Sequence, residues 1–188
     1  MSTKFPISRK YAPTWQHHIV RYAFALPFCY RKRVLDAGCQ MGFGGHLASY
    51  VANHVTFADI NQKYIDQSKN LHRHLCPTDY LLADFEKESP NRQWDTILAF
   101  EVIEHLSNPH VFLQGIKDHL PDGGKLVFSV PHMVENHEHK QLYDEKKIRD
   151  LISQYLTLEE FYIQDKNPIS LGPLYGDLKC YVGVATKI

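Results

Sequence analysis

The stretch VLDAGCQMGFGG, residues 34–45, decides the fold of this chain. It joins an apolar strand expected over residues 33–36 to a helix expected over residues 43–52, and it holds four glycines. Glycines let the backbone turn sharply and keep side chains away from a ligand, and the exposed N–H groups of a helix start suit an anionic group. The dinucleotide pattern GxGxxG fails because position 47 is not glycine, and no Gly-Lys-Ser/Thr completes a phosphate loop. Asp36, inside the turn, favours a ligand that carries a positive amino group.

Outward from this loop, strands and helices alternate along the chain. Further strands are expected at residues 55–59, 79–83, 94–100, 125–130, 158–164 and 180–186, and further helices at 15–26, 60–75, 109–120 and 144–155. This order predicts a mostly parallel sheet with right-handed crossovers, in which ligands bind beyond the carboxyl ends of the strands. Pro27 is expected to end the first helix. We expect one domain over residues 1–188, in which an arm and helix at 1–30 cover the ligand cleft.

Composition narrows the class of protein. Lys plus Arg and Asp plus Glu number 21 each in 188 residues, so the chain lacks the broad basic surface of a nucleic-acid binder. No apolar run approaches the roughly 20 residues that span a bilayer, and MSTKFPISRK has no apolar signal core. The four cysteines show no CxxC pair, as expected for a reduced protein. These features predict a cytoplasmic protein without a membrane or nucleic-acid partner, and they indicate no particular oligomeric state.

VLDAGCQMG resembles the first motif of the class I S-adenosylmethionine-dependent methyltransferases. The resemblance implies a doubly wound, Rossmann-like α/β fold: a seven-stranded, mostly parallel sheet with an antiparallel last strand and helices on both faces. It also implies S-adenosyl-L-methionine as cofactor, with Asp36 serving the amino group and Gly38, Cys39 and Gly42 lining its path. Gln40 departs from the family, which usually has glycine at that position.

Later landmarks of the cofactor site follow in order. Asp59 ends a strand in FADIN, where a carboxylate can accept both hydroxyls of a ribose, and Ile60 would pack on the adenine. Asp84 and Phe85, in LLADF, match the family position that holds the adenine amino group and ring edge. Each acid alone could be a helix cap or a solvated charge. Arg21, in RYAFALPFCYRKRVLDAGC, and Phe100 complete the predicted cofactor set.

The string AFEVIEHLSNP, residues 99–109, resembles the fourth motif of methyltransferases that act on small molecules, lipids or sugars. A helix beginning near Glu101 would place Glu101, Glu104 and His105 on one face. His105 is then a candidate general base, because imidazoles exchange protons near neutral pH, and Glu104 could orient it. Alternatively, Glu101 caps the helix and His105 makes an inert hydrogen bond. His139, in a histidine-rich loop expected to overhang the same cleft, is the third catalytic candidate.

Glu101, Glu104, His105 and His139 together resemble the metal-binding set of methyltransferases that modify the 3′ end of small RNAs. A divalent metal can activate and orient a hydroxyl, so this chemistry is sensible. A metal is possible but not expected, because the loop at 130–136 is short and no separate RNA-binding region is present.

The expected function is methyl transfer from S-adenosylmethionine to an oxygen, or less favourably a nitrogen, of a small molecule or glycan precursor. The segment NHEHKQLYDEKKIRDLI resembles one in methyltransferases of glycan pathways. One alternative is a metal-dependent RNA 3′-terminal 2′-O-methyltransferase. Another is a non-catalytic cofactor-binding partner subunit, which the substitution at Gln40 would favour.

Overall fold

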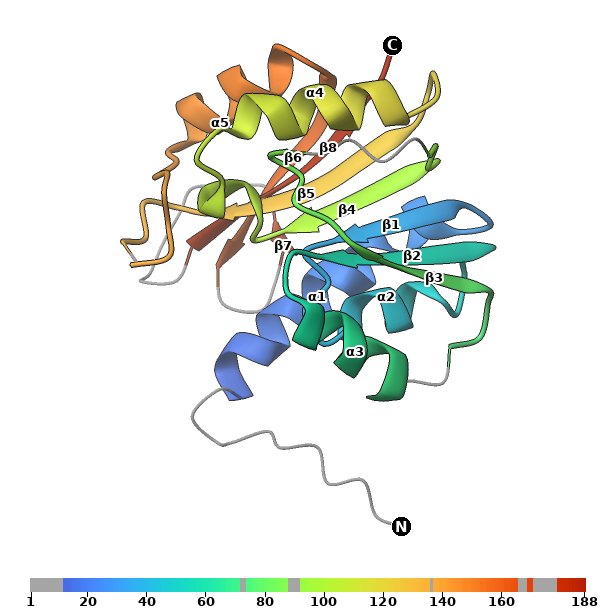
Figure 1. Cartoon of the computed structure of the whole chain (residues 1–188). Coiled ribbons are helices and arrows are strands. Elements are labelled where there is room, and N and C mark those ends of the chain that lie inside the picture. The colour runs from blue at the N-terminus through green and yellow to red at the C-terminus, as the bar shows by residue number, and fades with distance from the viewer. Residues whose placement is uncertain (1–11, 72–73, 88–91, 136, 166–168, 171–178) are drawn as a thin grey trace.

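A computed structural model describes residues 12–71, 74–87, 92–135, 137–165, 169–170 and 179–188. Eight strands form one sheet, and helices cover both of its faces (Figure 1). The helices are α1 (Ala12–Cys29), α2 (Phe43–Ala48), α3 (Gln62–Leu71), α4 (Pro109–His119) and α5 (Glu145–Ser153), with a short 3-10 helix η1 (Ile103–His105). The strands are β1 (Arg33–Ala37), β2 (His54–Asp59), β3 (Thr78–Leu82), β4 (Thr96–Phe100), β5 (Lys125–Pro131), β6 (Thr157–Asp165), β7 (Ile169–Ser170) and β8 (Lys179–Thr186).

The strand order places a ligand crevice in the middle of the sheet. The order is β3-β2-β1-β4-β5-β8-β6-β7, and β1 to β5 pair in parallel whereas β8 pairs antiparallel with β5 and β6. The chain winds outward from β1 to β3 and then crosses back to β4, so the connections after β1 and β4 diverge. Ligands bind at such a reversal, outside the carboxyl ends of the strands.

Two apolar clusters fix the helices on the sheet. On one face, α1, α2 and α3 pack over β1 and β2 through Tyr22, Ala48 and Ile65. On the other face, α4 and α5 cover β4 and β5 through buried side chains that include Phe112 and Ile148. The central strands are buried on both faces, as in parallel sheets generally. The predicted doubly wound architecture is therefore confirmed.

Two features of the structure differ from the sequence-based expectation for physical reasons. Pro27 does not end α1, which runs to Cys29, because Pro27 falls in the last turn and removes little of its hydrogen bonding. Thr96 donates a hydrogen bond of 2.6 Å to the carbonyl of Phe28 in that turn. The two-residue strand β7 was not predicted, since a pair of residues carries no periodic pattern.

No helix among the described residues is long and apolar enough to cross a membrane.

Gly44 allows α1 to approach the glycine loop. A Cβ atom at this position would lie 1.8 Å from Cζ of Tyr22, whose ring is also packed edge-on against Phe100. Gly44→Ala is therefore expected to lower the free energy of unfolding by about 1–3 kcal/mol, measured by urea denaturation, because the ring must move in a packed core. In a Tyr22→Ala background the same substitution should be nearly neutral, and an equal loss in both backgrounds would contradict this steric origin.

Candidate active site

The glycine loop after β1 is held by a buried carboxylate. Asp36 is fully buried, and its two oxygens accept hydrogen bonds from the Tyr22 hydroxyl at 2.8 Å and the Gly45 amide at 2.7 Å. Burial raises the pKa of Asp36 to about 7, although both hydrogen bonds oppose that rise. Gly38 and Gly42 have φ of 70° and 81°, a left-handed conformation that favours glycine. Asp36 thus ties α1 to the loop, and its predicted role toward the cofactor's amino group stays a prediction.

Asp59 and Gln40 connect the end of β2 to the glycine loop after β1. The Asp59 carboxylate, at the end of β2, accepts hydrogen bonds of 2.9 Å from the amides of Gln40 and Asn61. Gln40 has φ of 46°, which explains why glycine suits this position. The loop nevertheless closes with Gln40 in place. Each carboxylate oxygen has two acceptor sites, so these amides leave capacity for ribose hydroxyls.

The residues predicted to contact the adenine lie along the same edge of the sheet. Ile60 follows β2 and is 66% exposed, so an apolar surface is available at the end of the strand. Asp84 follows β3, accepts a hydrogen bond from the amide of Glu86 and pairs with Lys87 at 2.8 Å, which lowers its pKa. Phe85 packs against Phe112 of α4, with ring centroids 5.6 Å apart. The glycine cradle, the Asp59 carboxylate and the uncovered Ile60 fit a nucleoside with an amino-acid extension.

Residues of α1 join this edge from the opposite side of the loop. Tyr22 packs edge-on against Phe100, with ring centroids 4.9 Å apart, and Cys39 is buried beside them in the same cluster. The guanidinium of Arg21 is buried and lies 2.7 Å from Glu101 Oε1 and 2.9 Å from Ser129 Oγ. The predicted cover of the cofactor cleft by the arm and helix at 1–30 stays a prediction, because residues 1–11 lie outside the described residues.

The predicted helix beginning near Glu101 is wrong. Glu101 has φ of 55°, which a right-handed helix excludes, and only the short η1 follows it. Glu101 does not cap η1 either, because Val102 occupies that position. Its carboxylate turns toward Arg21 and also accepts hydrogen bonds from Ser129 and Cys180. Burial alone would raise the pKa of Glu101, but these partners, Arg21 foremost, lower it below its ordinary value.

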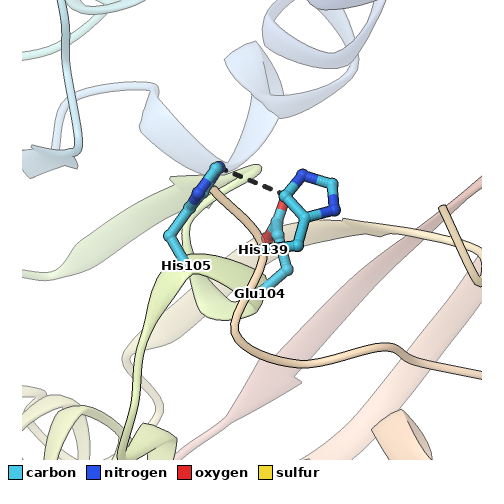
Figure 2. Close-up of side chains that lie close together, drawn as sticks. All are labelled: Glu104, His105 and His139. Carbon is cyan, nitrogen blue, oxygen red and sulfur yellow. Dashed lines mark ion pairs between the residues drawn. The ribbon is translucent and has the colours of Figure 1, made fainter. Parts of the chain in front are cut away.

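Glu104, His105 and His139 do come together (Figure 2). One ligand atom from each lies within 4.8 Å of the other two, and the two imidazole rings meet edge-on with centroids 4.9 Å apart. The backbone amides of Lys140 and Gln141 donate to the carbonyl of Glu104, so the loop after β5 is fixed against η1. Three residues of the predicted set of four therefore lie together, whereas Glu101 is paired with Arg21, and metal binding by the set stays a prediction.

Backbone carbonyls orient both imidazoles. Nδ1 of His105 lies 3.1 Å from the carbonyl of Glu138, and Nδ1 of His139 lies 2.8 Å from the carbonyl of Val134. A carbonyl only accepts hydrogen bonds, so each Nδ1 carries the proton and Nε2 is left as the basic nitrogen. Nε2 of His105 lies 4.0 Å from Glu104 Oε1. Nε2 of each ring can therefore accept a proton or bind a metal ion.

The Glu104 carboxylate is fully buried, and neither oxygen accepts a hydrogen bond from the described residues. Such a group is costly unless a ligand or proton compensates it. Burial and the charge of Glu101 raise the pKa of Glu104 to about 9. One carboxylate and two imidazoles whose other nitrogens bond to carbonyls form a donor set that fits a divalent metal.

Glu104→Gln is expected to stabilise the metal-free protein at alkaline pH. A carboxyl whose folded pKa is raised contributes stability below its unfolded pKa and loses it as pH rises, here between about 4.5 and 9. At pH 8 the free energy of unfolding of the variant should therefore be about 1–3 kcal/mol higher than that of the parent. At pH 5 the gain should be smaller. Urea denaturation in EDTA measures this, with the exposed Glu159→Gln as control. A gain that does not depend on pH would contradict the assignment.

The other histidines of the loop after β5 do not join the cluster. His132 Nδ1 lies 2.8 Å from the Tyr181 hydroxyl, and the His137 side chain is exposed. His139, His137, Glu135 and Leu142 line an open hollow of about 450 Å³ next to the cluster. Ser129 and Cys180 were missed by the sequence analysis. Ser129 lies on β5 beside β4, and Cys180 lies on β8 beside β5, so their roles depend on the strand order, which no local motif records.

A glycine loop and acidic strand ends at the reversal point of a doubly wound sheet, beside a carboxylate–histidine cluster, define a methyltransferase of class I architecture. The chain belongs to the methyltransferase domain family, whose model matches residues 9–161. The predicted class of S-adenosylmethionine-dependent methyltransferases is confirmed at the level of the family. The branch that acts on small molecules or glycans stays a prediction.

Curated relatives and solved structures agree with this family. The chain is 28% identical over 120 residues to "Probable S-adenosylmethionine-dependent methyltransferase Rv3030" of Mycobacterium tuberculosis, covering 64% of the chain and 43% of the relative. It is 33% identical over 103 residues to the ubiquinone biosynthesis O-methyltransferase of Coxiella burnetii, covering 52% and 43%. The chain thus spans less than half the length of these curated relatives.

Among solved structures, the N-methyltransferase NodS of Bradyrhizobium japonicum in complex with S-adenosyl-l-homocysteine has a TM-score of 0.74 at 14% identity, covering 98% of this chain and 93% of NodS. A Haloferax volcanii methyltransferase, solved in complex with the Trm112 activator, has a TM-score of 0.75 at 15% identity, covering 94% and 91%. At these identities the similarity shows the fold.

Proposed function

We propose that this chain transfers the methyl group of S-adenosylmethionine to an oxygen of a small polar acceptor, such as a small molecule or glycan precursor. The observation that carries the proposal is the cluster of Glu104, His105 and His139. Its first two members follow β4 at the reversal point of the sheet, and His139 lies in the loop after β5. The cofactor loop after β1 lies at the neighbouring strand end, so acceptor and cofactor would meet between the two loops.

Bound S-adenosylmethionine supplies an electrophilic methyl group, so alignment of the acceptor contributes much of the rate. His105 receives the proton of the acceptor hydroxyl at Nε2, because Nδ1 is committed to the carbonyl of Glu138. Glu104 Oε1 lies 4.0 Å from this nitrogen and would stabilise the charged imidazole after the Glu104 carboxyl, whose pKa is raised to about 9, has itself lost its proton. His139 flanks the same space from the loop after β5.

The surroundings of the cluster support a polar acceptor. The hollow beside His139 is lined by a carboxylate, two imidazoles and one leucine. Such a lining offers hydrogen bonds to hydroxyl groups. The relatives include an O-methyltransferase by sequence and an N-methyltransferase by fold. An oxygen acceptor is favoured because a hydroxyl needs the base that His105 provides.

An acceptor screen tests this proposal. The purified chain is incubated with radiolabelled S-adenosylmethionine and separate pools of sugars, nucleotide sugars, phenols, amines and a short RNA, and label transfer is measured. Labelling of hydroxyl compounds supports the proposal, and labelling confined to amines or RNA contradicts it. Binding of S-adenosylhomocysteine without transfer to any pool favours the non-catalytic partner subunit instead.

A metal-assisted form of the same reaction is the second candidate. It is favoured by the buried Glu104 carboxylate, whose oxygens lack a partner among the described residues, beside two oriented imidazoles. Glu104, His105 and His139 would hold a divalent ion, which would polarise the acceptor hydroxyl. If transfer in the screen requires Mg²⁺ or Mn²⁺ and EDTA abolishes it, this candidate replaces the metal-free reaction.

A further inference from the structure

A buried ion pair joins α1 to the end of β4. The guanidinium of Arg21, 4% exposed as a residue, lies 2.7 Å from Glu101 Oε1, and Ser129 Oγ contacts both partners at 2.9 Å. Cys180 adds a thiol contact to the same Glu101 oxygen at 3.1 Å. Breaking such a pair leaves an uncompensated buried charge, so each partner depends on the other.

This ion pair lies between the two halves of the proposed active site. The residue after Arg21 is Tyr22, which contacts Asp36 and encloses Gly44 of the cofactor loop. On the other side, Glu101 precedes Glu104 by three residues, and its charge acts on that carboxylate. Arg21 is also one of the residues predicted from the sequence to contact the cofactor, so the carboxylate of a bound cofactor would meet a guanidinium that Glu101 already occupies.

We propose that Glu101 is a built-in competitor for Arg21, which exchanges the Glu101 carboxylate for the carboxylate of the cofactor or its product. This inference rests on the proposed function. A guanidinium has five donors in a planar fork and pairs readily with a carboxylate. Glu101 also has a left-handed backbone, a conformation that persists only while its surroundings enforce it. The competition lowers the affinity for S-adenosylhomocysteine and so assists release of the product.

Calorimetric titration with two probes tests the competition. S-adenosylhomocysteine carries the carboxylate, whereas 5′-methylthioadenosine keeps the nucleoside and sulfur but lacks the amino-acid portion. Glu101→Gln should bind S-adenosylhomocysteine about threefold to tenfold more tightly than the parent and methylthioadenosine unchanged. In an Arg21→Met background, Glu101→Gln should have no such effect, because the contested guanidinium is gone. Ser129→Ala, which keeps both charges, should tighten binding about twofold in the same direction.

Each result supports or overturns the inference. Tightening of both probes alike, or tightening that persists in the Arg21→Met background, means that Glu101 acts on the site without Arg21 and overturns it. Unchanged binding of S-adenosylhomocysteine by folded Glu101→Gln also overturns it, and Ser129→Ala decides the matter if thermal unfolding shows Glu101→Gln to be unfolded. If neither probe binds the parent, the cofactor assignment fails and the inference fails with it. Binding of both probes without methyl transfer leaves the competition intact and contradicts only the proposed reaction.

Discussion

Replacing His105 with alanine lowers the rate of methyl transfer by about 100- to 10,000-fold, the usual contribution of a positioned general base. The reason is geometric: Nδ1 is held by the Glu138 carbonyl, and Nε2 is thereby presented toward Glu104, beside the His139 ring. The measurement is a single-turnover assay with the acceptor found in the screen. Binding of S-adenosylhomocysteine should change less than twofold, because His105 belongs to the acceptor side.

His110→Ala is the matched control for His105→Ala. His110 is a histidine close to His105 in sequence, but it lies exposed on α4 and its Nδ1 contacts the Tyr155 hydroxyl at 2.8 Å. Its replacement should leave the rate within about twofold, as expected for a surface substitution. Equal rates in the parent and His105→Ala would remove the base from the mechanism and leave alignment as the source of catalysis.

Asp59→Ala is expected to weaken S-adenosylhomocysteine binding by more than about tenfold, or 1.4 kcal/mol. Two effects add: the carboxylate would no longer accept ribose hydroxyls, and the amides of Gln40 and Asn61 would lose their acceptor. A lost hydrogen bond to a charged group contributes about 1.5–3 kcal/mol. Asp59→Asn, which keeps one acceptor oxygen, should give an intermediate loss in the same calorimetric titration.

Asp79→Ala controls for the general loss of an acid near the sheet edge. Asp79 lies near the amino end of neighbouring β3 and pairs with Arg92 at 2.7 Å, far along the strand from the cofactor loop. The Asp79→Ala variant should bind S-adenosylhomocysteine with the affinity of the parent. Parental affinity in a folded Asp59→Ala variant would show that the ribose assignment is wrong.

The fold was predictable because its evidence is local. The glycine loop of residues 34–45 and the apolar run that contains β4 determine their own conformations, so their order predicted the doubly wound sheet. The helix expected at Glu101 was wrong because a distant residue decides its conformation. Arg21, 80 positions earlier in the sequence, and Ser129 on β5 draw the carboxylate away, and the backbone turns left-handed.

The candidate site was predicted in part for the same reason. Glu104 and His105 are adjacent in the sequence, and His139 reaches them because the amides of Lys140 and Gln141 bond to the Glu104 carbonyl. The overhang of that loop was expected, but its pinning to η1 was not visible in any motif.

The attachment of α1 through Tyr22 has a consequence for how the chain can be shortened. A truncated version beginning at Arg33 would keep every motif by which the glycine loop is recognised, yet it would lose the hydroxyl that donates to Asp36. The buried carboxylate would keep only the Gly45 amide as partner among the described residues, and Gly44 would face solvent where the ring now lies. A minimal catalytic fragment of this chain therefore has to include α1, and sequence searches that start at the glycine loop omit residues on which the loop depends.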